Sequence, residues 1–359
     1  MEEKVFSNEN EMFKYIKDEV VAKQNVFKCY INEIKLDELA NVPILTSLFA
    51  SEYDVSEETI AECMESGVVA SLPVEGVKKT IPAYPTSLAS LSERAGLFGK
   101  TITYHPIEMN GGFKYYPDEC QIIMQEGTLL AAHSNQYAYL RQDQLMQTAM
   151  LGLEEEMGCY EFIQGEYSPW MTKISWRFPE AKFTRLGITA TPALQFTTND
   201  VAKCGANLHA TMEVENYIDG KKEIVSCRMG QSLSCTHKDG HTISDFKNNI
   251  EMVFSLLKDS EEKIMELREI TILHPEDCFM NLVRHYNLPI KAGEKALDDF
   301  SVFRSETVNA FDLYLYLWNI TMYLKVEKVP ATKICDIEEI IARTAHLNAA
   351  AWQKFDVAK

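Results

Sequence analysis

Cationic and aromatic side chains interleave in one stretch of the chain, residues 173–185. Its members are Lys173, Trp176, Arg177, Phe178, Lys182, Phe183 and Arg185. Proteins that bind single-stranded nucleic acid track phosphates with cations and stack bases on aromatic rings. We therefore take Lys173, Trp176, Arg177, Lys182 and Arg185 as nucleic-acid-binding candidates. An alternative stays open, because on one strand the cations would share a solvated face while Trp176 points to the core.

Cysteines and histidines lie close in sequence in residues 227–241. Cys227, Cys235, His237 and His241 carry the thiolates and imidazoles that zinc prefers, and the two histidines have a finger-like spacing. The two cysteines, however, are eight positions apart, which is too far for a finger. A hairpin strand with a buried cysteine explains the pattern equally well. We predict that no metal is bound.

Acidic and basic residues also permit a nuclease-like interpretation. Asp118 and Glu180 would hold a metal ion, and Lys182 would orient the attacking water. The two halves are some 60 residues apart, and Glu180 follows a proline, so a polar turn is the simpler interpretation. The sequence contains neither a Gly-x-Ser-x-Gly elbow nor a complete phosphate loop. We assign no catalytic residue and no cofactor, and whether the protein is an enzyme stays open, with binding favoured.

Residues 311–323 form a helix that is apolar almost all round, so it must be covered on more than one side. Phe311, Tyr314, Tyr316 and Trp318 are our interface candidates, because aromatic residues are enriched at the cores of interfaces. A protein partner or self-association would then be expected. The alternative is that the rest of the chain covers this helix.

The elements that position these residues predict an α+β fold. Alternating runs predict a mostly antiparallel sheet in the middle of the chain, and Asp219-Gly220 is a strong hairpin signal. The expected strands are 121–132, 173–178, 193–198 and 208–237, with a helix at 144–156. We divide the chain into a mixed, mostly helical region 1–100, an α+β core 101–260 and a helical region 261–359.

Helix signals dominate the two ends of the sequence. The expected helices are 8–23, 56–67, 86–96, 242–257, 278–286, 305–324 and a last one begun by the capping pair Asp336 and Glu339. One short strand, 27–34, is expected in the N-terminal region. No Pro/Gly/Ser linker separates the three regions, so we expect them to pack together.

Composition restricts the classes of function. With 359 residues, 46% hydrophobic and 10% aromatic, the chain is typical of a globular protein and not of a disordered one. A net charge of −18 argues against a simple basic groove for duplex DNA. Residues 173–247 are the exception, with ten Lys or Arg against eight Asp or Glu. Nine cysteines, no leader-like N-terminus and no long apolar run predict a cytoplasmic protein without disulfides or a membrane partner.

Four segments resemble a known family. A strand at 129–132 runs into His133-Ser134-Asn135-Gln136-Tyr137 and then a helix; residues 175–179 and 196–201 and the strand Cys235-Thr236-His237 follow in order. This arrangement resembles the phage- and plasmid-encoded family catalogued as domain of unknown function 932, over residues 121–257. At the family's Asp-Arg position this chain has Asn135-Gln136. We expect Ser134 and Tyr137 to be structural, since a Ser-x-x-Tyr step can turn the chain.

The resemblance implies a mobile genetic element, and it carries no established chemistry. We therefore expect a mobile-element accessory protein that acts by binding, with single-stranded nucleic acid as the first ligand to consider. The alternative is an acidic protein-binding inhibitor of a host defence system, or a scaffold that self-assembles.

Overall fold

The computed structural model describes residues 3–38, 57–88, 90, 104–109, 112–201, 204–218, 221–238, 240–300 and 308–358. Its centre is an eight-stranded antiparallel sheet in the order β1-β10-β11-β13-β14-β15, with β12 beside β13 and β16 beside β14. The strands are β1 (Lys4–Phe6), β10 (Glu161–Ser168), β11 (Met171–Arg177), β12 (Phe183–Arg185), β13 (Ile188–Thr198), β14 (Ala206–Ile218), β15 (Lys221–Arg228) and β16 (Leu233–Cys235).

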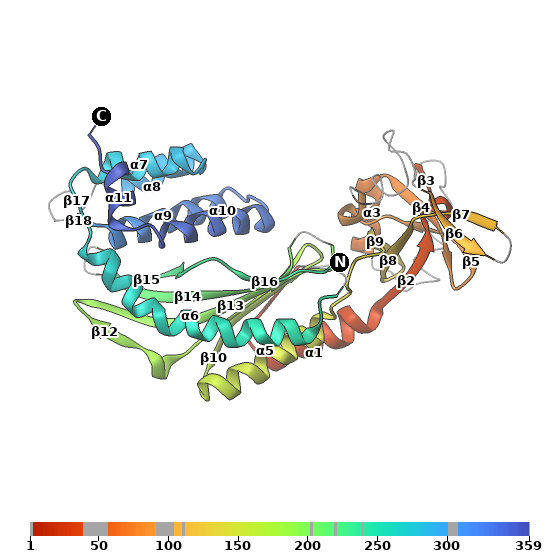
Figure 1. Ribbon diagram of the computed structural model, residues 1–359, viewed down its shortest axis with the longest axis horizontal. Coiled ribbons are helices and arrows are strands. Elements are labelled where there is room, and N and C mark those ends of the chain that lie inside the picture. Colours follow the sequence, from red (N-terminus) through yellow and green to blue (C-terminus); the bar gives the residue numbers. More distant parts are fainter. Residues whose placement is uncertain are drawn as a thin grey trace.

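Three helices cover one face of this sheet (Figure 1). They are α1 (Glu9–Tyr15), which continues as a π turn and a 3-10 turn to Lys23, α5 (Gln142–Met157) and the long α6 (Ile243–Glu269). Alternation along the strands explains the contact, because every second side chain of a strand points to the same face. Ile174 and Trp176 of β11, and Leu194 and Phe196 of β13, therefore all point to the helices. Phe246 of α6 packs edge-on to Phe196 at a centroid distance of 5.4 Å.

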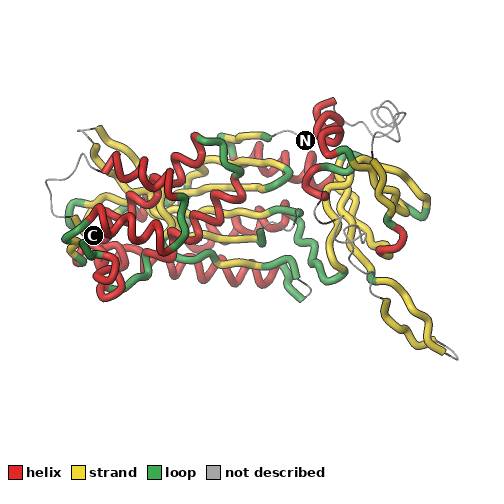
Figure 2. Tube along the Cα trace, turned by 90° about the horizontal axis from the view of Figure 1, so that it is seen from above, coloured by secondary structure: helices red, strands yellow, loops and turns green. Residues whose placement is uncertain are grey.

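A helical bundle follows α6 and sits over the opposite face and the β15 edge (Figures 1 and 2). Its helices are α7 (Pro275–His285), α8 (Ile290–Phe300), α9 (Ala310–Val326), α10 (Ala331–Thr344) and α11 (Ala349–Phe355); β17 (Thr271–Ile272) pairs with β18 (Val308–Asn309). The core of the bundle surrounds α9 and extends to residues of β14 and β15 such as Met212 and Cys227.

A smaller unit lies at the other end of the molecule and holds three further antiparallel sheets with the orders β2-β8-β9, β3-β4-β5 and β6-β7 (Figure 1). The elements are β2 (Gln24–Tyr30), a 3-10 turn (Ile31–Glu33), β3 (Lys35–Glu38), α3 (Glu57–Ser66), β4 (Val68–Val74), β5 (Val77–Pro82), β6 (Tyr104–Met109), β7 (Gly112–Pro117), β8 (Glu119–Gln125) and β9 (Thr128–Ser134). The β6–β7 hairpin projects away from the body (Figure 2).

The α+β fold with antiparallel sheets is confirmed, whereas the mostly helical N-terminal region is wrong. Strands dominate there, because β4 and β5 form a hairpin around Glu75-Gly76, whose positive φ angles of 51° and 76° make a tight turn. β2 completes a sheet with β8 and β9. Strands 121–132 therefore belong to this unit and not to the central sheet.

Several helix boundaries also differ from the prediction. The capping box of Thr242 and Asp245 is confirmed, but α6 continues twelve residues beyond Leu257, to Glu269. Asp336 and Glu339 do not start a helix; they lie within α10, which begins after Pro330, and α11 follows as a separate helix. Pro330 cannot continue the preceding helix, and α10 begins directly after it. The helix therefore starts earlier than the capping pair indicated.

Three predicted features fall on residues outside the described ranges. They are most of the helix 86–96, the boundary near residue 100 and the Asp219-Gly220 turn, although the flanking strands β14 and β15 do pair in a hairpin register.

Candidate ligand-binding cleft

The second face of the central sheet is polar over most of its width. Three rows of facing side chains run across the strands, namely Glu161–Arg177–Ala193–Thr211–Arg228, Gln164–Ser175–Gln195–His209 and Glu166–Lys173–Thr197–Asn207. Such a face is usually solvated, yet Thr197, His209, Thr211 and Arg228 are buried under α9 and α10. A polar face that is roofed by helices needs partners for its donors and acceptors.

Arg228 stands at the centre of this buried polar face. It is only 2% exposed. One guanidinium nitrogen donates to Gln195 Oε1 at 3.0 Å and to Glu338 Oε2 at 2.5 Å, and the other reaches Glu339 Oε2 at 3.5 Å. Its Nε has no hydrogen-bond partner among the described residues. Acids of α10 thus attach this side of the helix to the sheet through a charge pair, while its isoleucines pack in the core around α9.

His209 lies beside Arg228, beneath the same helix. Its Nε2 is 3.2 Å from Thr197 Oγ1, and its Nδ1 is 4.0 Å from Glu339 Oε2. Burial, together with the charges of Arg228 and Lys173, holds the pKa of His209 well below its usual range. The imidazole is therefore neutral at physiological pH and works as a hydrogen-bonding group and not as a cation.

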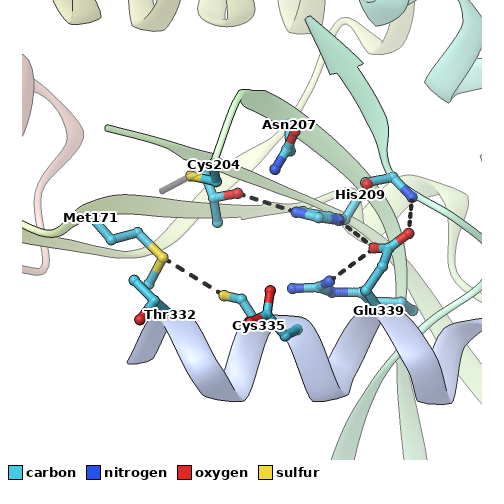
Figure 3. A pocket seen from close by; sticks show the side chains of 11 residues that line it. Met171, Cys204, Asn207, His209, Thr332, Cys335 and Glu339 are labelled. Atoms are coloured by element: carbon cyan, nitrogen blue, oxygen red, sulfur yellow. Dashed lines mark hydrogen bonds and ion pairs between the residues drawn. The ribbon is translucent and has the colours of Figure 1, made fainter. Parts of the chain in front are cut away.

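A small cavity of about 100 Å³ opens on the His209 side of Arg228 (Figure 3). Met171, Cys204, Asn207, Cys335 and Glu339 are among its lining residues. The Cys335 thiol is 3.6 Å from the Met171 sulfur. Within the described residues, no three His, Cys, Asp or Glu side chains come close enough to hold a metal ion.

A larger cavity, of about 220 Å³, lies on the other side of Arg228. Its floor is the polar sheet face and its wall is α9 with the Glu338 turn of α10. Its lining is Ile163, Gln164, Glu166, Lys173, Ser175, Gln195, Thr211, Glu213, Ser226, Cys227, Arg228, Trp318, Thr321, Lys325 and Glu338. A cavity of about 150 Å³ holds benzene, so this one has room for a small metabolite. We call the two cavities with the residues between them the polar cleft.

A second polar cluster lies at the junction of the smaller unit with the central sheet. The Tyr137 ring is stacked between His133, at a centroid distance of 3.8 Å, and His237, at 5.1 Å. Asp200 is buried beside them, where its Oδ2 accepts from Gln24 at 2.9 Å and from Gln142 at 2.6 Å. These bonds join β2 and α5 to the loop after β13, so the cluster connects the two units.

Electrostatics at this junction are dominated by burial. Burial raises the pKa of Asp200, against the two amide donors, and lowers the pKa of His237. Asp200 Oδ1, Tyr137 Oη and His237 Nε2 have no hydrogen-bond partner among the described residues. Asn199, next to Asp200, donates to the Cys204 sulfur at 2.9 Å, which places the junction directly beside the polar cleft.

The nucleic-acid candidates do not form one exposed strip. Trp176 is fully buried in the core, where its indole N–H donates to Glu9 at 2.5 Å. Three cations pair with acids: Arg177 with Glu161, Lys182 with Glu215, and Arg185 with Glu261. Lys173 alone enters the polar cleft.

The interface candidates are buried within the chain. Phe311, Tyr314, Tyr316 and Trp318 belong to the core around α9, so they do not form the exposed surface that we predicted. The sheet edge and the neighbouring helices cover most of this helix, although Met322 stays 49% exposed, because an apolar helix is stabilised by burial against the rest of the chain. Self-association itself stays a prediction.

The other candidate sets are dispersed. Cys227 packs in the core around α9, Cys235 packs against α6, and His237 belongs to the junction, so these three members of the candidate zinc set are not brought together. Asp118, between β7 and β8, and Glu180, just before β12, lie at opposite ends of the molecule (Figure 1). The nuclease arrangement is therefore absent from the described residues.

Sequence reasoning missed Arg228, His209, Glu338 and Asp200 as site residues. The strand pattern contains a signal for His209 and its neighbours, because residues 193–197 and 207–211 place polar side chains on one face. Such a pattern predicts a face that is exposed to solvent. That face becomes a cleft only because α9 and α10 cover it, and no local sequence pattern predicts that these helices pack there. Three of the four segments behind the family resemblance meet in space at the junction cluster, whereas residues 175–179 lie elsewhere in the central sheet.

Comparison with known proteins gives no relative: no family model, no curated protein and no solved structure matches this chain. The family resemblance therefore stays a prediction. Among the residues that the structure describes, none of the helices is long and apolar enough to cross a membrane.

Proposed function

We propose that the protein acts by binding, and that the polar cleft is the site of a small polar ligand. One observation carries the proposal: the sheet's polar face is roofed by helices, yet it stays hollow around the buried Arg228. Native interiors pair nearly all of their buried polar atoms. Here Arg228 Nε, His209 Nδ1 and Asn207 Oδ1 all face this region without a hydrogen-bond partner among the described residues.

The burial of charge supports the same conclusion. A buried ion pair such as Arg228 with Glu338 contributes little to stability compared with apolar packing of similar volume. Its presence under α10, next to two cavities, is typical of a recognition site, where a few polar groups orient a ligand in a concave pocket.

Mass spectrometry of the small molecules released on denaturing the purified chain tests this function. Ser175→Trp fills the larger cavity from its floor, and Thr184→Trp places the same ring on the exposed strand β12 as a control. We expect one compound to be enriched from the wild type and from Thr184→Trp, and lost from Ser175→Trp. Equal recovery from all three chains, or no enrichment, would contradict the proposal.

A protein partner is a second candidate, and one observation favours it. Phe113 and Tyr115 of the projecting β7 strand are 68% and 65% exposed, and they share one face because they are two residues apart. Pull-down with the wild type and with Phe113→Ser/Tyr115→Ser tests this candidate. A protein captured equally by both chains would exclude the hairpin as the contact.

The mobile-element setting and single-stranded nucleic acid as the ligand remain proposals that rest on the resemblance and on residues 173–185. The ion pairs of Arg177, Lys182 and Arg185 do not favour a nucleic-acid ligand, because these cations already have acidic partners.

A further inference from the structure

The charged groups around the larger cavity differ in how far they are already engaged. Three acids contribute to its lining, and each has a partner. Glu338 pairs with Arg228 at 2.5 Å, Glu213 faces Arg177 at 3.8 Å, and Glu166 accepts from Gln164 at 2.8 Å. Two of the acids, Glu338 and Glu213, thus face a cation of the protein, and Glu166 accepts a hydrogen bond from a neutral amide.

The cations of the lining are less engaged. Lys173 and Lys325 make no hydrogen bond or ion pair through their ammonium groups with any residue that the structure describes. Glu166 is the cross-strand neighbour of Lys173, but the two side chains do not form an ion pair. Arg228 adds an unpartnered Nε, and this side chain is 98% buried.

Neutral hydrogen-bond donors stand between these cations. The hydroxyls of Ser175, Thr211 and Ser226 also line the cavity, whereas the Thr321 hydroxyl already donates to the Trp318 carbonyl oxygen at 2.8 Å. Hydroxyls can donate to the oxygen atoms of an anion, and Arg228 lies behind them as a rigid, permanently charged donor. The available groups thus include several donors, whereas the three carboxylates and Gln195 Oε1 already have partners.

The geometry points to an anion: we infer that the ligand of the polar cleft carries a carboxylate or phosphate group, held by Lys173 and by the free edge of Arg228 with Lys325 at the rim. This inference rests on the proposed function and specifies the chemistry of its ligand. The overall charge of −18 repels anions at long range, so recognition depends on short contacts within the cavity.

Calorimetric titration of the full chain with inorganic phosphate and, separately, with succinate tests the inference at constant ionic strength. Lys173→Met removes the ammonium but keeps the length of the side chain. Lys182→Met is the matched control, because that lysine pairs with Glu215 outside the cavity. Loss of one charge-assisted hydrogen bond should weaken binding by about tenfold or more in Lys173→Met and leave Lys182→Met unchanged.

The two anions distinguish a phosphate ligand from a carboxylate ligand, and saturable binding of either one supports the inference. Binding of neither anion to the wild type would overturn it, as would equal binding to wild type and Lys173→Met. These failures differ from failure of the proposed function: a compound released by the wild type but not by Ser175→Trp would keep the cleft as the binding site and reject only its anionic character.

Discussion

The two faces of the central sheet are built from alternate residues of the same strands, yet they are covered in opposite ways. On one face, Trp176 and Phe196 pack against α5 and α6 in a continuous apolar core. On the other, Lys173 and Gln195 face a cleft, and α10 is attached through Glu338 and Glu339 to Arg228.

This difference suggests that one face mainly stabilises the fold and that the other is suited to bind a ligand. Apolar burial contributes about 25 cal/mol per Å² without regard to direction, so the apolar face stabilises the fold. A face attached through charges gains little net stability, but it offers directed donors and acceptors. We therefore expect substitutions on the two faces to affect different measurements.

The largest effect on stability is expected from the apolar face. Phe246→Ala removes a fully buried ring that packs on Phe196, and should lower the free energy of unfolding by about 3–5 kcal/mol. Denaturant titration measures this, with the exposed Met252→Ala of the same helix as the control. A loss below about 1 kcal/mol would contradict the view that this face carries the core.

Breaking the ion pair of the polar face should cost nearly as much, for a different reason. Arg228→Met leaves Glu338 buried without its cation, which costs about 3–5 kcal/mol. The double variant Arg228→Met/Glu338→Met removes both charges and should recover most of that loss. If the double variant is as unstable as the sum of the two single variants, the two charges are not coupled, and the explanation that Glu338 is left unpaired is wrong.

A smaller effect is expected from His209, as a dependence on pH. Because its folded pKa lies well below the unfolded value near 6.5, the unfolded chain binds a proton that the folded chain does not. The stability that this group contributes is present above the unfolded pKa and is lost as pH falls below it. Between about pH 7.5 and about pH 5.5 the wild type should lose about 1.4 kcal/mol more than His209→Gln. Parallel pH profiles of the two chains would show that the imidazole is not held neutral.

The smallest effect on stability is expected from Lys173→Met. The ammonium of this half-buried lysine has no ion-pair partner among the described residues, so its removal should change the free energy of unfolding by less than about 0.5 kcal/mol. Thermal unfolding of the two chains without added anion measures the change. A loss of 2 kcal/mol or more would show that Lys173 is part of the folded framework and not held free for a ligand.

Local sequence patterns predicted much of this fold and little of its site. Alternation placed Ile174 and Trp176 on one strand face, and the capping pair Thr242 and Asp245 located the start of α6. The polar cleft could not be predicted this way, because Glu338 reaches Arg228 across 110 residues. In the same way, His133 and His237 come to lie on either side of Tyr137 only through the packing of two units.

The central claim is that the polar face, and not the apolar face, is the ligand site. Calorimetric titration of three full-length chains with inorganic phosphate and with succinate tests it directly: the wild type, Ser175→Trp on the polar face and the conservative Phe246→Leu on the apolar face. We predict that the anion bound by the wild type binds Phe246→Leu with an affinity within about twofold, and that Ser175→Trp shows no saturable binding. Retained binding in Ser175→Trp, or a loss confined to Phe246→Leu, would contradict the account.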